Sequence, residues 1–176
     1  QARSRTRNKK GEPTDPVRAT GWGVVVYVNE HSCLSNYGRY LVIRHPVEGL
    51  DVYSLYAHLS AVRTDLKPGA AVRAGEAVAT MGRTTNTRER ISRDRAHVHV
   101  ELNLMVNEKF AAWFPHLHPQ DRNDHGIWNG QNVLGMGPSV LLIAQRQQDA
   151  KFRIGSVRHA QPERCRGVVR CPHFAL

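Results

Sequence analysis

The sequence predicts a mainly β protein built on an antiparallel sheet. Seven short segments between residues 17 and 104 have the β-branched and aromatic content, or the alternation, that is typical of strands. The connections between them are short and rich in glycine and proline. None is long enough for the helix that parallel neighbours need, so antiparallel pairing is expected. The expected strands are residues 17–20, 24–28, 40–44, 52–57, 71–73, 77–81 and 96–104.

The strand at residues 24–28 is the clearest, because it consists of four valines and one tyrosine. In the strand at residues 52–57, Val52, Ser54 and Tyr56 should share one face of the sheet, since side chains alternate along a strand. Residues 45–50 contain proline and glycine and are expected to connect two strands as a hairpin. Residues 82–94 are polar and arginine-rich and predict a flexible loop.

The segments that flank this core predict little regular structure. Residues 1–16 are polar and strongly basic at their start, which indicates a solvated N-terminal arm or loop. Residues 17–106 form the expected core, and residues 107–176 a C-terminal extension. Within the extension, residues 110–137 predict an ordered loop region. A short helix is expected at about residues 138–152, because proline suits a first turn and an apolar stripe follows it.

Length and composition limit the classes of protein that the chain can belong to. Its 176 residues fit one domain, and no apolar run approaches the ~20 residues of a membrane span. The net charge of +10 favours polyanionic surroundings, such as nucleic acid, anionic lipid or an acidic cell-wall polymer. Three cysteines make no disulfide framework, although Cys165 and Cys171 could pair in an oxidising compartment.

The pair His97-Val98-His99 lies in an expected strand, so both imidazoles should point to one face, together with Glu101. Two such imidazoles can share a metal ion, or one can bind it while the other moves protons. Ten histidines give roughly 0.6 such pairs by chance, so the spacing is not specific by itself. A second pair, His116-Leu117-His118, is flanked by prolines and is expected in a surface loop.

Three segments in order resemble the lysostaphin/LytM-type zinc metallopeptidases, which cut peptidoglycan cross-bridges. They are Tyr56-Ala57-His58-Leu59-Ser60, the glycine-punctuated stretch at residues 66–84, and His97-Val98-His99-Val100-Glu101. The segment at residues 37–45, which begins Tyr37-Gly38-Arg39, also resembles a family strand that begins Tyr-Gly-Asn. The resemblance covers about half of the chain. It implies an open groove in a β fold related to the duplicated hybrid motif.

The resemblance also implies a role for each histidine. His99 matches the zinc ligand of the family, and His58 and His97 match the two other histidines, which position the attacking water and stabilise the tetrahedral intermediate. The implied cofactor is one Zn²⁺ ion, the implied partner is a peptidoglycan peptide, and the implied location is the bacterial cell envelope, periplasmic or extracellular. A groove lined by all three histidines is therefore expected.

The family's other two zinc ligands come from a His-x-x-x-Asp motif ahead of the first core strand, and no such motif occurs here. We expect these ligands to lie before residue 1, and residues 1–176 alone to bind zinc weakly. The alternative is a catalytically inactive domain that binds peptidoglycan or regulates a cell-wall hydrolase. A lipoyl-type carrier is disfavoured, because no lysine lies between Lys67 and Lys109. Specific nucleic-acid binding is disfavoured because no recognition module is visible.

Overall fold

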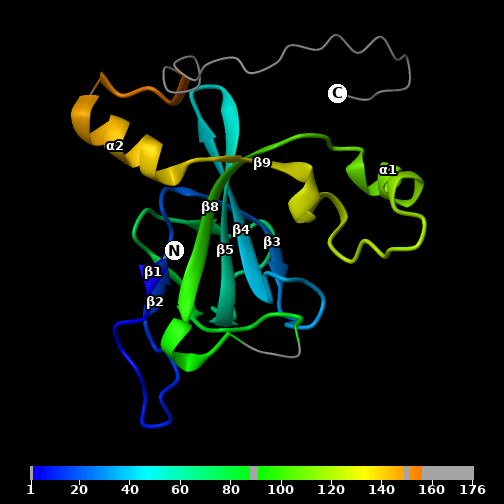
Figure 1. Cartoon of the computed structure of the whole chain (residues 1–176). Helices are drawn as coiled ribbons and strands as arrows, with labels where there is room; N and C mark the ends of the chain where they lie inside the picture. The colour runs from blue at the N-terminus through cyan, green and yellow to red at the C-terminus, as the bar shows by residue number, and fades with distance from the viewer. Residues whose placement is uncertain (1, 88–90, 149–150, 156–176) are drawn as a thin grey trace, which may run out of the picture.

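The computed structural model describes residues 2–87, 91–148 and 151–155, and Figure 1 shows a curled sheet with two helices near one end. The mainly β, antiparallel fold class predicted from the sequence is confirmed. The strands and helices, in chain order, are β1 (Ala2–Arg3), β2 (Pro16–Arg18), β3 (Gly23–Asn29), β4 (Arg39–Val47), β5 (Leu50–Val62), β6 (Ala71–Val72), β7 (Ala77–Met81), β8 (His97–Met105), α1 (Phe110–Leu117), β9 (Val133–Met136) and α2 (Pro138–Gln148).

The sheet has the strand order β1-β8-β5-β4-β3-β6, and every pair is antiparallel. Besides its ladder with β4, strand β5 is long enough to form two further ladders, with β8 and β7. Its first half pairs with β8 through Ala57, and its second half pairs with β7 from Leu59 onward. Because β7 in turn pairs with β2, the sheet curls over at the end of β5.

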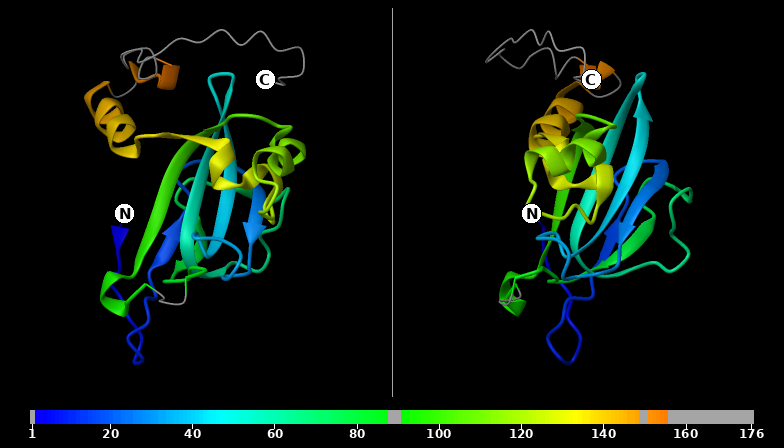
Figure 2. Two further views of the ribbon diagram at one scale, coloured as in Figure 1. Left: turned by 45° about the vertical axis from the view of Figure 1, so that its right-hand side comes forward. Right: turned by 90° about the vertical axis from the view of Figure 1, so that its right-hand side faces the viewer.

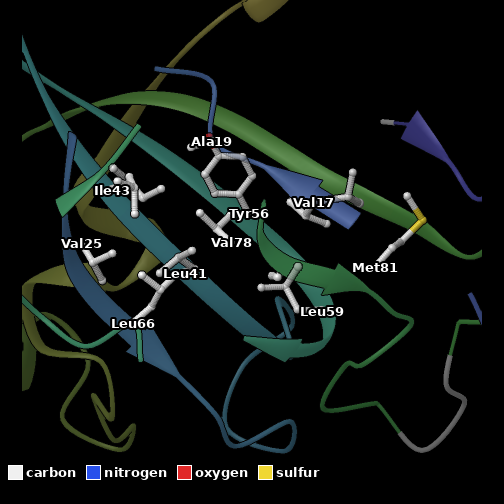
Figure 3. Close-up of a cluster of buried hydrophobic side chains, with 13 residues drawn as sticks. Val17, Ala19, Val25, Leu41, Ile43, Tyr56, Leu59, Leu66, Val78 and Met81 are labelled. Atoms are coloured by element: carbon white, nitrogen blue, oxygen red, sulfur yellow. The ribbon is translucent and has the colours of Figure 1, made fainter. Parts of the chain in front are cut away.

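The larger hydrophobic core fills the inside of this curl. Figure 3 shows side chains from β2, β3, β4, β5 and β7 that point toward one another. Tyr56 lies at the centre and is almost completely buried. Its hydroxyl donates to Thr20 Oγ1 and accepts from the Thr20 amide, so the one polar atom of this side chain is satisfied. The core therefore fixes β5, the strand that leads to the candidate site.

A second core lies on the opposite face of β4 and β5, under the chain that follows β8. It contains Tyr40, Tyr53 and Leu55, with Trp128 packed against them from the C-terminal segment. The ring centroids of Tyr53 and Trp128 are 5.4 Å apart. The right-hand view of Figure 2 shows α1 and the chain before β9 on one side of the sheet. The two faces of the sheet therefore have separate cores.

All seven expected strands are present, and β7 has the expected bounds of residues 77–81. Two strands were not expected. Strand β9 pairs with β8 from Leu102–Met136 to Met105–Val133, so the C-terminal extension continues the sheet. Strand β1 pairs with the other end of β8, with Ala2 opposite Val98 and Arg3 opposite His97.

The expected N-terminal loop is more ordered than its composition indicates. The Asp15 carboxylate accepts hydrogen bonds from the Ser4 hydroxyl and from the amides of Arg5 and Thr6. A β-bridge between Arg7 and Pro13 closes a hairpin within this segment. The segment is exposed and mostly irregular, as an arm or loop should be, but one carboxylate, nine to eleven residues away along the chain, organises it.

The C-terminal region also differs from the expectation. Residues 110–137 were expected as a loop, but α1 forms there, with Phe110 and Phe114 buried one turn apart and Pro115 inside the helix. Helix α2 begins at Pro138 as expected and ends at Gln148 rather than near residue 152, although residues 149–150 lie outside the described part of the chain. Cys165 and Cys171 also lie outside it. No helix among the described residues is long and apolar enough to cross a membrane.

Candidate active site

Strand β8 presents one row of polar side chains on the face opposite the larger core. His97, His99 and Glu101 alternate with Val98 and Val100, which pack into that core. Cross-strand pairing places His99 opposite Ala57 and Glu101 opposite Leu55 on β5. The shared face of the two histidines, expected from the alternation, is therefore the face that carries the aromatic core.

His58 follows Ala57 at the point where β5 leaves the β8 ladder. Its backbone has a φ of +61°, a left-handed conformation that only a few per cent of residues other than glycine adopt. The His58 amide donates a 2.8 Å hydrogen bond to the carbonyl of Tyr37 instead of to a sheet neighbour. Strained backbone of this kind persists where the surrounding structure enforces it, and is common at functional sites.

The bend brings the three histidines together. The ring centroids of His58 and His97 are 5.0 Å apart, and those of His58 and His99 are 6.0 Å apart. All three side chains are half-buried, so they remain accessible from solvent. Groups that act on one reacting atom must converge in this way.

The partners of His58 and His97 define which ring nitrogen carries a proton. His58 Nδ1 donates to the Thr84 carbonyl at 2.9 Å, and His97 Nδ1 donates to the Arg95 carbonyl at 2.7 Å. A carbonyl oxygen can only accept, so the neutral form of each ring has a lone pair on Nε2. Burial lowers the pKa of His58, and the neighbouring His97 and His99 lower it further, which favours this neutral form.

His99 has the opposite arrangement. Its Nε2 donates a 2.6 Å hydrogen bond to Glu101 Oε1, which leaves the lone pair of the neutral ring on Nδ1. Tyr37 Oη donates to the same carboxylate oxygen at 2.9 Å, and Asn103 Nδ2 donates to Oε2. Burial acts to raise the pKa of Glu101, but these hydrogen bonds outweigh it and lower the pKa. Glu101 therefore stays ionised and holds the His99 ring in one orientation.

Tyr37 is a proton donor in this network and remains one at high pH. Burial raises its pKa, and the negative charge of Glu101 raises it further. The ring packs beside His99, with centroids 5.9 Å apart, and also contacts Gly130 of the C-terminal segment. Tyr37 therefore connects the histidine site to the second core.

Thr84 links the site to the neighbouring loops. Its carbonyl accepts a hydrogen bond from His58 Nδ1. Its hydroxyl accepts a hydrogen bond from the Arg39 amide and donates one to the Leu59 carbonyl. The close approach of Thr84 to the chain at residue 38 requires glycine there. An added Cβ at Gly38 would lie 2.4 Å from the Thr84 backbone, and the φ of Gly38 is +61°. Gly82 is equally tight, because an added Cβ would lie 2.3 Å from the Ser60 nitrogen.

Two other histidines have both ring nitrogens occupied. His45 donates to the Trp22 carbonyl and accepts from the Ser54 hydroxyl, each at 2.7 Å. His125 accepts from the Tyr27 hydroxyl at 2.8 Å and donates to the Leu34 carbonyl at 3.2 Å. Both are buried and act in packing. Among the described residues, His58, His97 and His99 each have one ring nitrogen without a hydrogen-bond partner, which distinguishes them from the packing histidines.

The second histidine pair is separate from this site. His116 and His118 lie on and just after α1 rather than in a loop, and neither ring contacts the three clustered histidines. His118 approaches Asp121 at 3.7 Å and packs beside Phe114.

The donor atoms of the three histidines determine whether a zinc ion fits the site. A catalytic zinc site uses three protein ligands and an open position. A histidine ligand commonly donates its other ring N–H to a carboxylate, and His99 does so to Glu101. Across residues 2–87, 91–148 and 151–155, however, no three His, Cys, Asp or Glu side chains are placed to hold one ion. One ligand position therefore fits zinc, and the complete set is not within the described residues.

Sequence patterns indicated the three histidines and placed Glu101 on their face, but they assigned no role to Thr84 or Asn103. Both act through contacts across the sheet, which local patterns do not reveal. Tyr37 lies in the segment at residues 37–45, which resembles a family strand, so the sequence did carry a signal for this residue.

The chain is thus a curled antiparallel β domain on which three histidines converge. Residues 7–112 match the family model of peptidase family M23, and the chain belongs to that family. No curated protein sequence matches the chain.

Solved structures are also similar. A zinc-containing peptidase from Vibrio cholerae is 31% identical over 51% of this chain and 23% of its own, with a TM-score of 0.39. A putative glycyl-glycine endopeptidase LytM from Ruminococcus gnavus is 27% identical over 56% of this chain and 37% of its own, with a TM-score of 0.45. The catalytic domain of lysostaphin from Staphylococcus simulans is 24% identical over 51% of this chain and 58% of its own, with a TM-score of 0.39. The chain thus spans well under half the length of the first two.

Proposed function

We propose that this domain is the core of a zinc-dependent endopeptidase that cuts peptide bonds in peptidoglycan. The observation that carries the proposal is the convergence of His58, His97 and His99, each with one ring nitrogen free, at positions that resemble those of M23 peptidases. In this proposal His99 is a zinc ligand through Nδ1. His58 and His97 are the catalytic histidines.

The histidines suit proton transfer at a peptide bond. Nε2 of His58 or His97 can accept a proton from an attacking water, and the resulting imidazolium can stabilise the oxyanion or protonate the leaving nitrogen. The lowered pKa of His58 keeps it neutral and able to act as a base at neutral pH. Glu101 holds His99 in place throughout. A bound zinc ion would supply Lewis-acid polarisation of the water or the carbonyl.

The other two zinc ligands are proposed to come from chain that precedes Ala2. Strand β1 runs antiparallel to β8, with Arg3 opposite His97 and Ala2 opposite Val98. A strand that continued backward in this register would therefore pass beside His99. This direction supports the expectation that a His-x-x-x-Asp motif, in a longer chain, would complete the site.

The proposed setting is the bacterial cell envelope, periplasmic or extracellular, with a peptidoglycan peptide as the partner. The net charge of +10 suits an anionic wall, and the chain has no recognised nucleic-acid module.

A second candidate is a catalytically inactive M23 domain that binds peptidoglycan or regulates another hydrolase. It is supported by the donor set, because the described residues offer one fitted zinc ligand where catalysis needs three. Full-length protein distinguishes the two, since only the first requires cleavage of peptidoglycan.

Three alanine variants of the full-length protein test the first proposal, with zinc content and peptidoglycan cleavage measured on each. His99→Ala should lose zinc and activity together, because it removes a metal ligand. His58→Ala and His97→Ala should retain zinc and lose roughly 10²-fold or more in turnover, the scale of a lost general acid–base or oxyanion group.

His118→Ala is the matched control: His118 lies just after α1, away from the three clustered histidines, and its loss should leave both measurements unchanged. If His97→Ala loses zinc and His99→Ala keeps it, the two roles are reversed. Cleavage that survives all three substitutions refutes the endopeptidase proposal.

A further inference from the structure

A polar cavity adjoins the histidine site on the far side of Thr84. It has a volume of about 360 Å³, within the range of small-ligand pockets. Gly82 and Thr84, which pack against the backbone of His58 and hold its ring, form part of the cavity wall. The cavity therefore shares two wall residues with the support of His58. The remaining lining residues are Glu12, Pro13, Ser32, Arg39, Ser60, Arg83 and Thr85.

The positive charge in the cavity exceeds the negative charge. Glu12 is the one carboxylate in the lining, and Arg83 holds both of its oxygens, with Nε–Oε2 at 2.8 Å and Nη2–Oε1 at 3.0 Å. Arg93 also bonds this carboxylate, at 3.1 Å. Glu12 is therefore fully engaged, and it does not neutralise the second arginine of the cavity, Arg39.

Arg39 is held in place by carbonyl oxygens alone. Its Nε donates to the Glu30 carbonyl and its Nη1 to the Ser60 carbonyl, each at 2.8 Å. Within the described part of the chain, Nη2 has no hydrogen-bond partner and the guanidinium has no carboxylate partner. Arg39 is thus a preoriented cation with a donor to spare.

Hydroxyl side chains share the cavity with this cation. Ser32, Ser60 and Thr85 line the same cavity. The Ser60 hydroxyl already donates to the Thr80 carbonyl, whereas the Ser32 hydroxyl has no hydrogen-bond partner among the described residues. A fixed guanidinium with neighbouring hydroxyl donors matches a carboxylate, which accepts several hydrogen bonds in one plane. A neutral or cationic group would leave the charge of Arg39 uncompensated.

We propose that this cavity is a subsite for a carboxylate group of a peptide bound at the three histidines, with Arg39 as its charged partner. The inference rests on the proposed peptidase function for its substrate class. It goes further in naming acidic peptides as the preferred ligands and Arg39 as the residue that selects them. Binding, however, needs neither zinc nor cleavage.

Two capped peptides test the proposal on the present chain. Acetyl-Ala-Glu-Ala-amide carries one carboxylate, and acetyl-Ala-Gln-Ala-amide is its neutral isostere. Calorimetric titration should give about 10-fold or more tighter binding of the glutamate peptide, the scale of a charge-assisted hydrogen bond, and added salt should shrink the difference.

Variants then assign the preference to the cavity. Arg39→Gln should reduce the ratio of the two affinities to about one. Because that change also removes bonds to Glu30 and Ser60, Ser32→Asp provides an independent variant. It places a negative charge in the cavity and leaves the Arg39 contacts in place. Arg44→Gln is the matched control, since Arg44 lies exposed on the same strand and pairs with Asp51.

Equal affinity for both peptides, or no measurable binding of the glutamate peptide, overturns the subsite. So does a preference that survives both Arg39→Gln and Ser32→Asp in folded protein. Loss of the preference in these two variants but not in Arg44→Gln supports it. If the preference holds while full-length protein fails to cleave peptidoglycan, the subsite stands and the peptidase proposal falls.

Discussion

Glu101 and Thr84 hold the two parts of the histidine site in place. Glu101 accepts hydrogen bonds from His99, Tyr37 and Asn103, so its carboxylate fixes the His99 ring and a tyrosine of the second core. The Thr84 carbonyl accepts a hydrogen bond from His58, and the Thr84 hydroxyl accepts from the Arg39 amide and donates to the Leu59 carbonyl. Neither residue needs to touch a substrate, because each acts by limiting the orientation of a residue that does.

Glu101→Gln should weaken zinc binding by the full-length protein about 10- to 100-fold, the usual cost of losing the partner of a metal-binding histidine. The amide is a weaker acceptor for His99, and its NH₂ group would face donors from Tyr37 or Asn103. Competition titration with a chelator measures the change. Glu108→Gln, at an exposed position after β8, is the control. An unchanged zinc affinity would show that Glu101 does not position a ligand.

Gly38→Ala should destabilise the chain by about 3 kcal/mol or more, since the alanine would combine a left-handed φ with a clash against Thr84. Gly49→Ala is the matched control. Gly49 has a φ of +76° and open space around its Cα, so only the conformational cost of about 1 kcal/mol applies. Urea unfolding followed by fluorescence compares the two. Equal losses would mean that the close approach to Thr84 is relieved by a shift of the loop.

At the scale of elements, the long strand β5 joins the sheet to the site. It pairs with β8 up to Ala57 and with β7 from Leu59, and His58 occupies the bend between the two ladders. The N-terminal hairpin packs against the same end of the sheet. Glu12 on this hairpin accepts hydrogen bonds from both Arg83 and Arg93, which lie near the two ends of the loop between β7 and β8. Two segments that look irregular in sequence thus stabilise each other.

Glu12→Gln should lower the melting temperature at neutral pH. The difference in melting temperature between wild type and variant should disappear in acid. The hydrogen bond from Arg83 lowers the pKa of Glu12 from 4.5 to about 2. A group with a depressed pKa in the folded state stabilises the fold above its unfolded pKa, and this contribution is lost as the pH falls toward the folded value. The difference between wild type and variant should therefore be constant above about pH 5 and shrink between pH 4.5 and 2.

Thermal melts of both proteins across that range measure the gap. Other carboxylates titrate in both proteins and cancel in the comparison. Glu108→Gln should show no such gap, because Glu108 forms no ion pair among the described residues. A gap that stays constant down to pH 2 would contradict the assigned role of Glu12.

At the scale of the whole molecule, local periodicity predicted the strands well. Alternation placed His97 and His99 on one face with Val98 toward the core, as found. The sequence did not predict α1, because Pro115 interrupts an eight-residue helix whose two phenylalanines provide most of its buried surface. It did not predict the N-terminal hairpin either, because that segment is ordered by contacts to Asp15 rather than by local propensity.

The histidine site likewise combines features that local sequence patterns predict with features that depend on tertiary packing. The His-x-His spacing indicated two of the three histidines, and the family resemblance supplied His58. The separation of 5.0 Å between His58 and His97 depends on the register of β5 against β8 and on a left-handed residue at the bend. Register and backbone strain arise from tertiary packing, so a single sequence does not encode them in any local pattern.

The C-terminal segment is attached to the sheet through His125, which makes it part of the fold. His125 is 8% exposed, accepts from Tyr27 and donates to Leu34, while nearby Trp128 packs on Tyr53. His125→Ala should therefore cost about 2–3 kcal/mol, the sum of two hydrogen bonds and a small cavity. The tryptophan near-UV circular dichroism signal should weaken in the same variant, because Trp128 would lose its fixed environment.

His116→Ala is the control, since His116 is exposed on α1 and its loss should change stability by less than about 0.5 kcal/mol. Urea unfolding gives the free energies. The peptide-binding preference assigned to Arg39 should survive His125→Ala, because none of the residues that line that cavity belongs to the C-terminal segment. The histidine cluster has a different dependence, since Tyr37 contacts Gly130 of the C-terminal segment and bonds Glu101. Loosening that segment should therefore disturb His99 before it disturbs the cavity. Loss of both together would show that the domain responds as one cooperative unit.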